Sequence, residues 1–400
     1  MDVKQWPLFV VILLATGCSI TKNTTVRTAP SQLIGNALSN AVFQYKVLMQ
    51  NTAEGVMPYS YKNGKIRTTR SRGWTAGFYP GTLLYLHKAT GDRSMYNEAL
   101  KRIVIMDSMQ YYTGNHDLGF MMYCSYGALY SIDPQTSYKQ ILINSARSLA
   151  KRYNPRVEAI RSWGDINDTE EFLVIIDNMM NLELLMWASK ATGDKSLRNV
   201  AIAHANTTIK NHFRPDNSSY HVVEYNPQTG AVVRKRTAQG AADESAWARG
   251  QAWGLYGYIM MYRETKNKRY LDMATKVAAF VLNHPNLPAD KIPYWDFNAP
   301  DIPNAPRDAS SAAIIASALI ELSEFSDRKL AEGYMSAAEK IITTLSAPEY
   351  TATGGQNGGF ILKHSVANLP RNVDVDGPLP YADYYYIEAL LRYRNLFEMK

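Results

Sequence analysis

The sequence predicts an all-α fold, an (α/α)6 barrel in which six helical hairpins form a closed toroid, with a small β-hairpin as an insertion. Apolar residues recur at helical spacing through most of the 400 residues, whereas alternating strand patterns are few. A unit of apolar helix, short turn and second helix also recurs, and such hairpins bury their apolar faces by stacking on one another. Long polar insertions make the spacing irregular, which favours a closed ring over an open solenoid.

Four of the hairpins are marked by turns that contain Gly, Asn or Asp, residue types that tolerate the left-handed conformation that closes a helix. We expect helices on both sides of the turns at 89–92, 191–194, 265–268 and 325–328. The β-hairpin is predicted by alternating strand patterns at 220–225 and 231–234 around a turn at 226–230. No linker divides residues 34–400, so we expect one domain there.

The first residues have the pattern of an export signal. A lysine precedes the short apolar stretch 6–15, and small residues then lead to Cys18. This pattern predicts a lipoprotein signal peptide over 1–17, a lipid on Cys18 and a polar tether over 18–33. The alternative is a plain secretory signal. No acidic run follows the cysteine, so we expect a periplasm-facing protein that is lipid-anchored in a bacterial outer membrane.

Composition excludes several classes of protein. The 43 Lys and Arg against 36 Asp and Glu give a net charge of +7, but the basic residues are scattered, unlike those of a nucleic-acid binder, and the densest run is Arg234-Lys235-Arg236. A count of 2 Cys excludes a disulfide framework. The chain has no Walker loop, no zinc-protease motif and no nucleophile elbow, and its 7 His are dispersed without metal-ligand spacing. The 27 Tyr and 7 Trp suit sugars as well as cores.

Two aspartates are the candidate acid groups. Asp177 lies in an apolar run that predicts a helix, and burial raises a carboxyl pKa into the range that suits acid catalysis. The alternative is a buried aspartate held by a helix cap or an arginine. Asp117 precedes another apolar helix, so it is either an N-cap or the second member of a carboxylate pair. Paired carboxylates are the usual equipment for glycosidic chemistry.

Aromatic and basic side chains suggest where a sugar could bind. Arg249 and Trp253 are four apart, so they share a helix face and either hold a sugar acid or form a packed helix with an ion pair. Trp74 and Phe78 are also four apart, and a stripe of this kind is a sugar platform or part of the core. His221, on the predicted β-hairpin, is a site residue or a lone surface histidine.

Taken together, these stretches resemble the unsaturated glucuronyl hydrolases, glycoside hydrolase family 88. The segments that carry the resemblance keep the family's order and are 74–81, 116–120, 176–181, 247–253, 294–297, 308–312 and 381–390. The resemblance implies an (α/α)6 barrel, in agreement with the hairpins. It also implies a hydrolase that removes the 4,5-unsaturated uronic acid from the non-reducing end of lyase-generated glycosaminoglycan oligosaccharides.

The family's chemistry is hydration of a vinyl ether: an acid protonates C4, water adds at C5, and the resulting hemiketal opens. The resemblance implies Asp177 as that acid, Asp117 as the group that binds ring hydroxyls and tunes it, and no metal or organic cofactor. The implied substrate contacts are Trp74, Phe78, His116, Trp163, His221, Gln239, Arg249 and Trp253, of which Trp163 and Gln239 match less closely.

Two departures from the family pattern bear on specificity. Ala238 stands where members often carry a histidine, which removes one polar contact. The stretch 368–380 holds Arg371, Asp374 and Asp376 in place of the Ser/Lys cluster that resembles the sulfate-recognising segment of some members. Recognition of sulfated chondroitin-type disaccharides is therefore not implied.

Three alternatives stay open. An unsaturated rhamnogalacturonyl hydrolase shares the barrel and the chemistry, but its pattern lacks the stretches around Asp117 and Asp177 as they are written here. A non-catalytic, lipid-anchored sugar-binding protein would have little need for a lone aspartate within an apolar run. A polysaccharide lyase would need a Tyr or His base beside a group that neutralises the substrate carboxylate. We expect no nucleic-acid partner, and membrane contact only through the lipid anchor.

Overall fold

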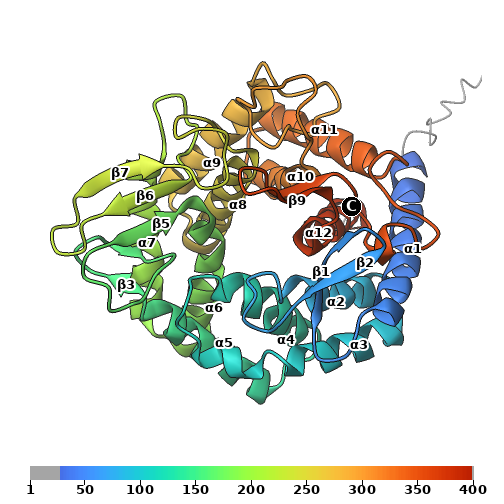
Figure 1. Cartoon of the computed structure of the whole chain (residues 1–400), viewed down its shortest axis with the longest axis horizontal. Coiled ribbons are helices and arrows are strands. Elements are labelled where there is room, and N and C mark those ends of the chain that lie inside the picture. The colour runs from blue at the N-terminus through green and yellow to red at the C-terminus, as the bar shows by residue number, and fades with distance from the viewer. Residues whose placement is uncertain (1–27, 399–400) are drawn as a thin grey trace, which may run out of the picture.

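The computed structural model describes residues 28–398 as a ring of helical hairpins (Figure 1). The inner ring consists of α2 (Phe78–Thr90), η3 with α4 (Gly119–Gly127 and Ala128–Ile132), α6 (Leu182–Thr192), α8 (Ala248–Thr265), α10 (Ala309–Ser323) and α12 (Pro380–Glu398). The outer ring consists of α1 (Thr28–Asn51), α3 (Arg93–Val104), α5 (Thr136–Ala150), α7 (Lys195–His212), α9 (Lys268–Asn283) and α11 (Arg328–Leu345). The predicted (α/α)6 barrel is confirmed.

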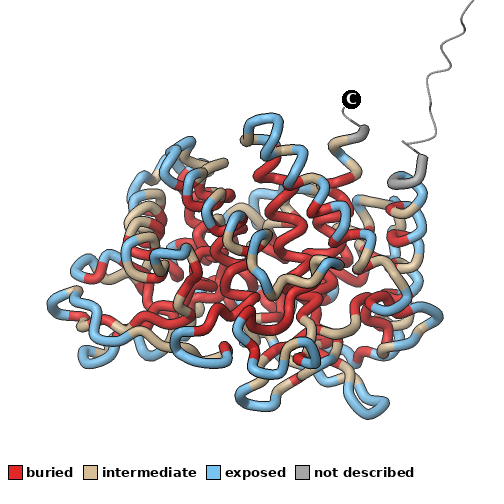
Figure 2. The backbone as a smooth tube through the Cα atoms, turned by 90° about the horizontal axis from the view of Figure 1, so that it is seen from above, coloured by how far each residue is buried: buried red, intermediate tan, exposed pale blue. Residues whose placement is uncertain are grey.

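Burial separates the two rings. All of α10, and α8 from Ala248 to Met261, are buried, as expected of helices that are surrounded by protein. The outer helices α9 and α11 instead bury a single stripe at helical spacing, for example Tyr270, Met273 and Val277. Figure 2 shows the same division, with buried backbone in the middle of the molecule and exposed loops around it.

The predicted turns have the expected cap chemistry. Gly91 and Gly193 close α2 and α6 in the left-handed conformation, with φ of 75° and 77°. The aspartates that follow them cap α3 and α7 by accepting backbone N–H groups of Ser94 and Ser196. The next outer helices, α9 and α11, have side-chain caps of the same kind from Asn267 and Asp327.

The predicted β-hairpin is confirmed as β6 (Val222–Tyr225) and β7 (Val232–Arg236), which pair antiparallel. A third strand, β5 (Phe172–Ile175), completes this sheet on the other side of β6. The remaining strands form two-stranded sheets: β1 (Met57–Lys62) with β2 (Lys65–Thr69), β3 (Tyr153–Asn154) with β4 (Ala159–Ile160), and β8 (Ser365–Asn368) with β9 (Val373–Gly377).

The predicted helix around Asp177 is wrong over its first half. The residues before it form β5, and Asp177 lies in the first turn of the 3-10 helix η4 (Ile176–Asn181), which leads into α6. All four residues of β5 are buried, and a buried strand reads as a continuous apolar run like a buried helix. The β-branched Val174 and Ile175 favour the strand.

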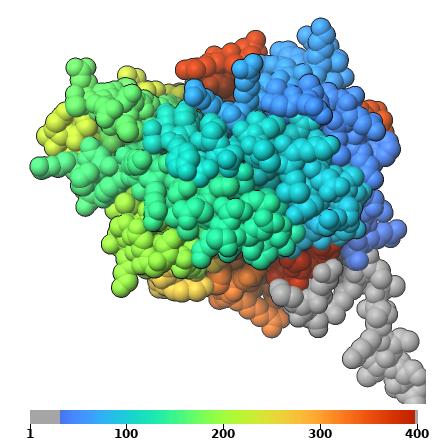
Figure 3. All heavy atoms as spheres, turned by 90° about the horizontal axis from the view of Figure 1, so that it is seen from below, coloured from blue at the N-terminus to red at the C-terminus, as the bar shows by residue number. Residues whose placement is uncertain are grey.

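Two hairpins stand at the same end of the barrel. In β1 and β2, the Ser60 hydroxyl and the Arg67 guanidinium both donate to Asp374 of β9, at 2.7 and 2.6 Å. Figure 3 shows segments of the blue and red ends of the chain projecting from the same side of the molecule. We call this end, which the N-termini of the inner helices face, the upper mouth.

The described chain begins earlier than the expected domain boundary. Helix α1 starts at Thr28, inside the stretch 18–33 that we expect to be a tether, although burial begins only near Ile34. Polar residues at the exposed start of a helix resemble those of a linker, which explains the difference. The expected signal peptide and Cys18 lie outside the described residues. Within residues 28–398, no helix has the length and hydropathy needed to cross a membrane.

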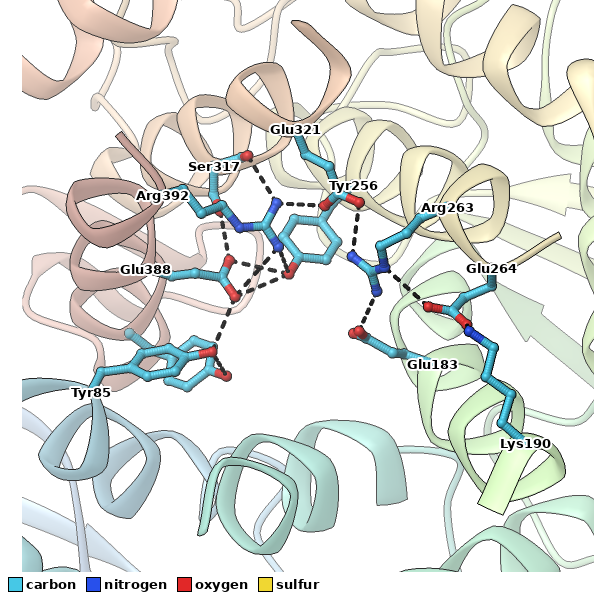
Figure 4. A network of polar contacts seen from close by, with 11 residues as sticks. Tyr85, Glu183, Lys190, Tyr256, Arg263, Glu264, Ser317, Glu321, Glu388 and Arg392 are labelled. Carbon is cyan, nitrogen blue, oxygen red and sulfur yellow. Dashed lines mark hydrogen bonds and ion pairs between the residues drawn. The ribbon is translucent and has the colours of Figure 1, made fainter. Parts of the chain in front are cut away.

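A network of ion pairs connects the inner helices away from the upper mouth (Figure 4). Glu321 of α10 accepts from Arg263 of α8 at 2.8 Å and from Arg392 of α12 at 2.5 Å. Glu388 of α12 accepts from the Tyr256 and Ser317 hydroxyls. Because these residues come from three inner helices, the network fixes their relative positions.

We expect Glu321→Gln to destabilise the fold by about 1–3 kcal/mol, because Arg263 and Arg392 each lose one charged partner although both keep other carboxylates nearby. Urea unfolding measures the change in the free energy of unfolding. Glu332→Gln is the control, since Glu332 pairs with Arg328 at the surface and such pairs contribute about 0–1 kcal/mol. Equal effects of the two substitutions would contradict this role of the network.

Candidate active site

The two candidate acids are brought together by a close backbone contact. Asp117 comes just before η3 and Asp177 lies at the start of η4. Asn181, at the end of η4, accepts the Phe120 N–H at 3.0 Å, and a methyl group on Gly119 would overlap the Asn181 backbone. Glycine at 119 therefore allows η3 and η4 to touch, which places both aspartates in one site.

Asp177 is buried, with 8% of its surface exposed, and its Oδ2 atom has no hydrogen-bond partner among the described residues. Burial raises the pKa of Asp177 to about 6, although the positive charge of Arg249 opposes the rise. The Asp177 carboxyl group is therefore not held by a helix cap or by an arginine, the alternative that the sequence allowed. It titrates near neutral pH.

Asp117 has the larger shift. Burial and the charge of Asp177 raise the pKa of Asp117 to about 8, against a smaller lowering by Arg152. The carboxyl group does not cap η3, whose N-cap position is Leu118 without a side-chain bond. The pair interpretation of Asp117 therefore describes the geometry better than the N-cap interpretation, and at neutral pH the two carboxyl groups hold roughly one proton between them.

Two neutral histidines lie beside the aspartates. His221 accepts the backbone N–H groups of Ala238 and Gln239 on Nδ1, at 3.1 and 3.2 Å, so its proton is on Nε2, which lies 3.6 Å from Asp177 Oδ2. Nε2 of His116 lies 3.3 Å from Asp117 Oδ1. Burial lowers the pKa of both imidazoles, that of His116 to about 3. His221 is therefore a buried site residue rather than a surface histidine.

Arg249 is close to Asp177 but is largely committed to protein groups. Its terminal nitrogens donate to the carbonyls of Val366 and Ala367 and to Gln239 Oε1, and one lies 3.4 Å from Asp308. Only Nε of this guanidinium has no partner among the described residues. Arg249 therefore forms the ion pair that the sequence allowed, with Asp308, and its guanidinium also orients Gln239.

The predicted aromatic residues divide between the site surface and the layer beneath it. Trp74 is half-buried and contacts Phe78, which is fully buried, with ring centroids 5.8 Å apart. Trp253 is also fully buried, and its indole Nε1 has no partner among the described residues. Trp163 is half-buried and meets the His221 ring edge-on at 6.0 Å. Phe78 thus supports the aromatic surface from below, whereas Trp74 and Trp163 reach it.

Three residues that shape the site were not predicted as site residues from the sequence. Trp247 packs against the His221 ring at 4.4 Å, and the Arg249 guanidinium lies over it. Tyr381 lies in the first turn of α12, and its ring centroid is 4.9 Å from that of Trp74. Its hydroxyl is buried and has no hydrogen-bond partner among the described residues. Arg152 carries a charge near Asp117. Trp247 and Tyr381 each begin a segment that carries the family resemblance, 247–253 and 381–390, whereas Arg152 had no sequence signal.

No three His, Cys, Asp or Glu side chains within residues 28–398 come together in a way that could hold a metal ion. The site therefore consists of two buried carboxyl groups, neutral imidazoles and aromatic rings at the upper mouth of a helical barrel. This is the equipment of a glycoside hydrolase.

Comparison with known proteins gives the family. Residues 48–321 match the model of Glycosyl Hydrolase Family 88, and the chain belongs to this family. It is 47% identical over 327 residues to an unsaturated glucuronyl hydrolase of Formosa agariphila, a match that covers 82% of this chain and 81% of that protein.

Solved structures are similar over nearly the whole chain. An unsaturated glucuronyl hydrolase specific for heparin matches with a TM-score of 0.89 and 47% identity, covering 92% of this chain and 98% of that one. A variant of the Streptococcus agalactiae unsaturated glucuronyl hydrolase, complexed with dGlcA-GalNAc6S, matches with a TM-score of 0.77 and 29% identity, covering 90% of this chain and 92% of that one. The resemblance seen in the sequence is thus confirmed.

The raised pKa of Asp117 makes stability depend on pH. An unfolded aspartate has a pKa of about 3.9, so between pH 4 and about 8 the folded protein holds a proton that the unfolded chain has released, and stability falls as pH rises. Asp117→Asn removes this dependence. We expect the free energy of unfolding of Asp117→Asn, relative to that of wild type, to increase as pH rises. The increase is at most about 1.4 kcal/mol per pH unit, and it levels off above pH 8.

Thermal or urea unfolding across pH 4–9 measures this difference. Asp301→Asn, on the exposed loop before α10, is the control and should show no such growth. A gain that is constant with pH would show that Asp117 is charged in the folded protein throughout this range.

Proposed function

We propose that this protein hydrolyses lyase-generated glycosaminoglycan oligosaccharides and releases the 4,5-unsaturated uronic acid from their non-reducing end. The proposal rests on Asp177. Its carboxyl group is buried, titrates near neutral pH, and has one oxygen without a hydrogen-bond partner among the described residues. The similarity to unsaturated glucuronyl hydrolases, one of them specific for heparin, favours this substrate class over an unsaturated rhamnogalacturonan fragment. An unsatisfied buried acid is also costly, which argues against a binding protein without catalysis.

Asp177 is the proposed acid. It gives its proton to C4 of the vinyl ether, and its charged form then takes a proton from the water that adds at C5. A pKa of about 6 suits a group that must act first as an acid and then as a base near neutral pH. The hemiketal formed at C5 opens and expels the remaining sugar, so no protein group needs to attack the anomeric carbon.

The neighbours of Asp177 have distinct proposed roles. Asp117, which keeps a proton near neutral pH, donates to a ring hydroxyl and limits the charge near the acid. His221 directs its Nε2–H toward Asp177 Oδ2, where it can orient the water or a substrate oxygen. His116 adds a neutral polar group beside Asp117.

Around this centre, Trp74 and Trp163 are the proposed sugar-stacking surfaces, with Phe78 beneath Trp74 and Trp253 buried beside Asp177. Arg249 and Gln239 form the polar wall.

The relatives support the assignment of the two aspartates. Two solved variants of the Streptococcus agalactiae enzyme each replace one aspartate with asparagine, and the two positions are as far apart in that chain as Asp117 and Asp177 are in this one.

We expect Asp177→Asn to slow the loss of the ultraviolet absorbance of the conjugated double bond by at least about 10²-fold, because the amide has no proton to give. For wild type, kcat/KM falls as pH rises through about 6, since the acid loses its proton there. The substrates are unsaturated disaccharides from hyaluronan, chondroitin and heparin. Asp272→Asn, on outer helix α9, is the control and keeps full activity.

Equal rates for wild type and Asp177→Asn would show that another group is the acid. Activity on a rhamnogalacturonan fragment alone would replace the proposed substrate.

We further propose that residues 1–17 are a signal peptide, that Cys18 carries the lipid and that the enzyme faces the periplasm from the outer membrane. The support is the apolar stretch followed by small residues and a cysteine. Mass spectrometry of the protein expressed from its full sequence in a Gram-negative host should find an acylated N-terminus at Cys18. Cys18→Ser should move the protein into the soluble fraction. An unmodified Cys18 in a cleaved, soluble protein would contradict the anchor.

A further inference from the structure

The backbone that carries Asp177 is held from two sides as it leaves β5. On one side, the Ile176 N–H donates to the carbonyl of His221, just before β6, at 3.0 Å. On the other side, the Ile175 N–H donates to the Ser162 hydroxyl at 2.9 Å. A buried backbone N–H group needs an acceptor, and here a side chain supplies it. The turn from β5 into η4 therefore depends on the Ser162 hydroxyl.

The hydroxyl of Ser162 contacts the chain on both sides of the acid. Ser162 is fully buried, and its hydroxyl also accepts from Asn178 Nδ2 at 3.4 Å. Ile175 comes two residues before Asp177, and Asn178 comes directly after it. The Asn178 amide is itself fixed, since Nδ2 also donates to the Ile160 carbonyl at 2.9 Å. One buried oxygen thus holds both ends of the turn in which the acid lies.

The direction of the Asp177 carboxyl group depends on such backbone anchors. Its Oδ2 atom has no hydrogen-bond partner among residues 28–398, and His221 Nε2 lies 3.6 Å from it. Side-chain bonds therefore do little to fix where this oxygen points. Proton transfer needs reacting atoms about 3–3.5 Å apart, and a misplacement of about 1 Å can cost about 10²-fold in rate. A shift of the turn would move the acid out of this range.

Ser162 reaches the other half of the site through its backbone. Its N–H donates to the Leu173 carbonyl of β5 at 2.7 Å, and its own carbonyl accepts the His116 N–H at 3.3 Å. His116 directly precedes Asp117, and Trp163 directly follows Ser162. The backbone of Ser162 thus serves the second aspartate and the proposed stacking tryptophan, whereas its hydroxyl serves the acid.

Arg152 fixes the segment in which Ser162 lies. Its guanidinium is buried and donates to four backbone carbonyls, those of Arg161, Ser162, Gly164 and Thr113. These bonds tie the end of α5 to the chain on both sides of Ser162 and to the stretch that leads to the second aspartate. The Ser162 hydroxyl is therefore a fixed point against which the turn of η4 is set.

We propose that Ser162 is a positioning residue for the acid: its hydroxyl holds the turn that carries Asp177 and so aims the carboxyl group at the reacting carbon. This inference rests on the proposed function, because it takes Asp177 as the acid. It adds to the machinery of the reaction a buried residue that acts only through the chain around the acid.

The test compares Ser162→Ala with Ser148→Ala, a control on α5 that also removes a buried hydroxyl, one that donates to the Gln110 carbonyl at 2.7 Å. The absorbance of the conjugated double bond in an unsaturated disaccharide gives kcat and KM. We expect Ser162→Ala to lower kcat by about ten- to a hundredfold with KM nearly unchanged, because Trp163 and Asp117 keep their backbone anchors. Ser162→Thr, which keeps the hydroxyl, should recover most of kcat. Ser148→Ala should lose a similar amount of stability in urea and keep wild-type kinetics.

Binding is measured separately by calorimetry in the Asp177→Asn background, where the acid is absent. There Ser162→Ala should leave the Kd of the same disaccharide unchanged, since the hydroxyl acts on the acid and not on the sugar. No absorbance loss with wild type would contradict the proposed function. With an active wild type, an unchanged kcat in Ser162→Ala, or an equal loss of kcat in Ser148→Ala, would overturn this inference. Weaker binding in Ser162→Ala would also overturn it, since Ser162 would then position the sugar-binding surface.

Discussion

The site depends on one packing contact, the approach of η3 to η4 at Gly119 and Asn181. It brings two carboxyl groups from segments sixty residues apart into one buried place. Burial disfavours the charge on each, and the charge of Asp177 further disfavours that on Asp117. With pKa values of about 8 and about 6, Asp117 keeps its proton near neutral pH, whereas Asp177 can act first as an acid and then as a base in the proposed hydration.

The barrel separates stability from chemistry. The upper mouth contains unpartnered polar atoms on Asp177, His221, Trp253 and Tyr381, which a substrate and water can satisfy and which cost stability when empty. The inner helices are instead joined by the network around Glu321 and Glu388, where each carboxylate has several donors. The network around Glu321 and Glu388 stabilises the inner helices and so offsets the cost of the unpartnered atoms at the site.

The sequence predicts the barrel well, because helical periodicity and turn chemistry act locally. Gly91 and Asp92, for example, end one helix and begin the next with no help from distant residues. It does not distinguish the buried strand before Asp177 from a helix, since both are continuous apolar runs. Nor does it reveal that Arg249 is occupied, because its partners Val366 and Ala367 are more than a hundred positions away. Tyr381 was not predicted as a site residue for the same reason, because it meets Trp74 only through the tertiary fold.

In the proposed reaction, a proton from Asp177 goes to C4 and the anomeric carbon is not attacked. The most direct measurement is to run the reaction in D2O and to identify the first products by NMR. We expect one deuteron at C4 of the released uronate, with the C4=C5 double bond lost in every turnover. Release of a monosaccharide that still contains the C4=C5 double bond, without deuterium at C4, would contradict it.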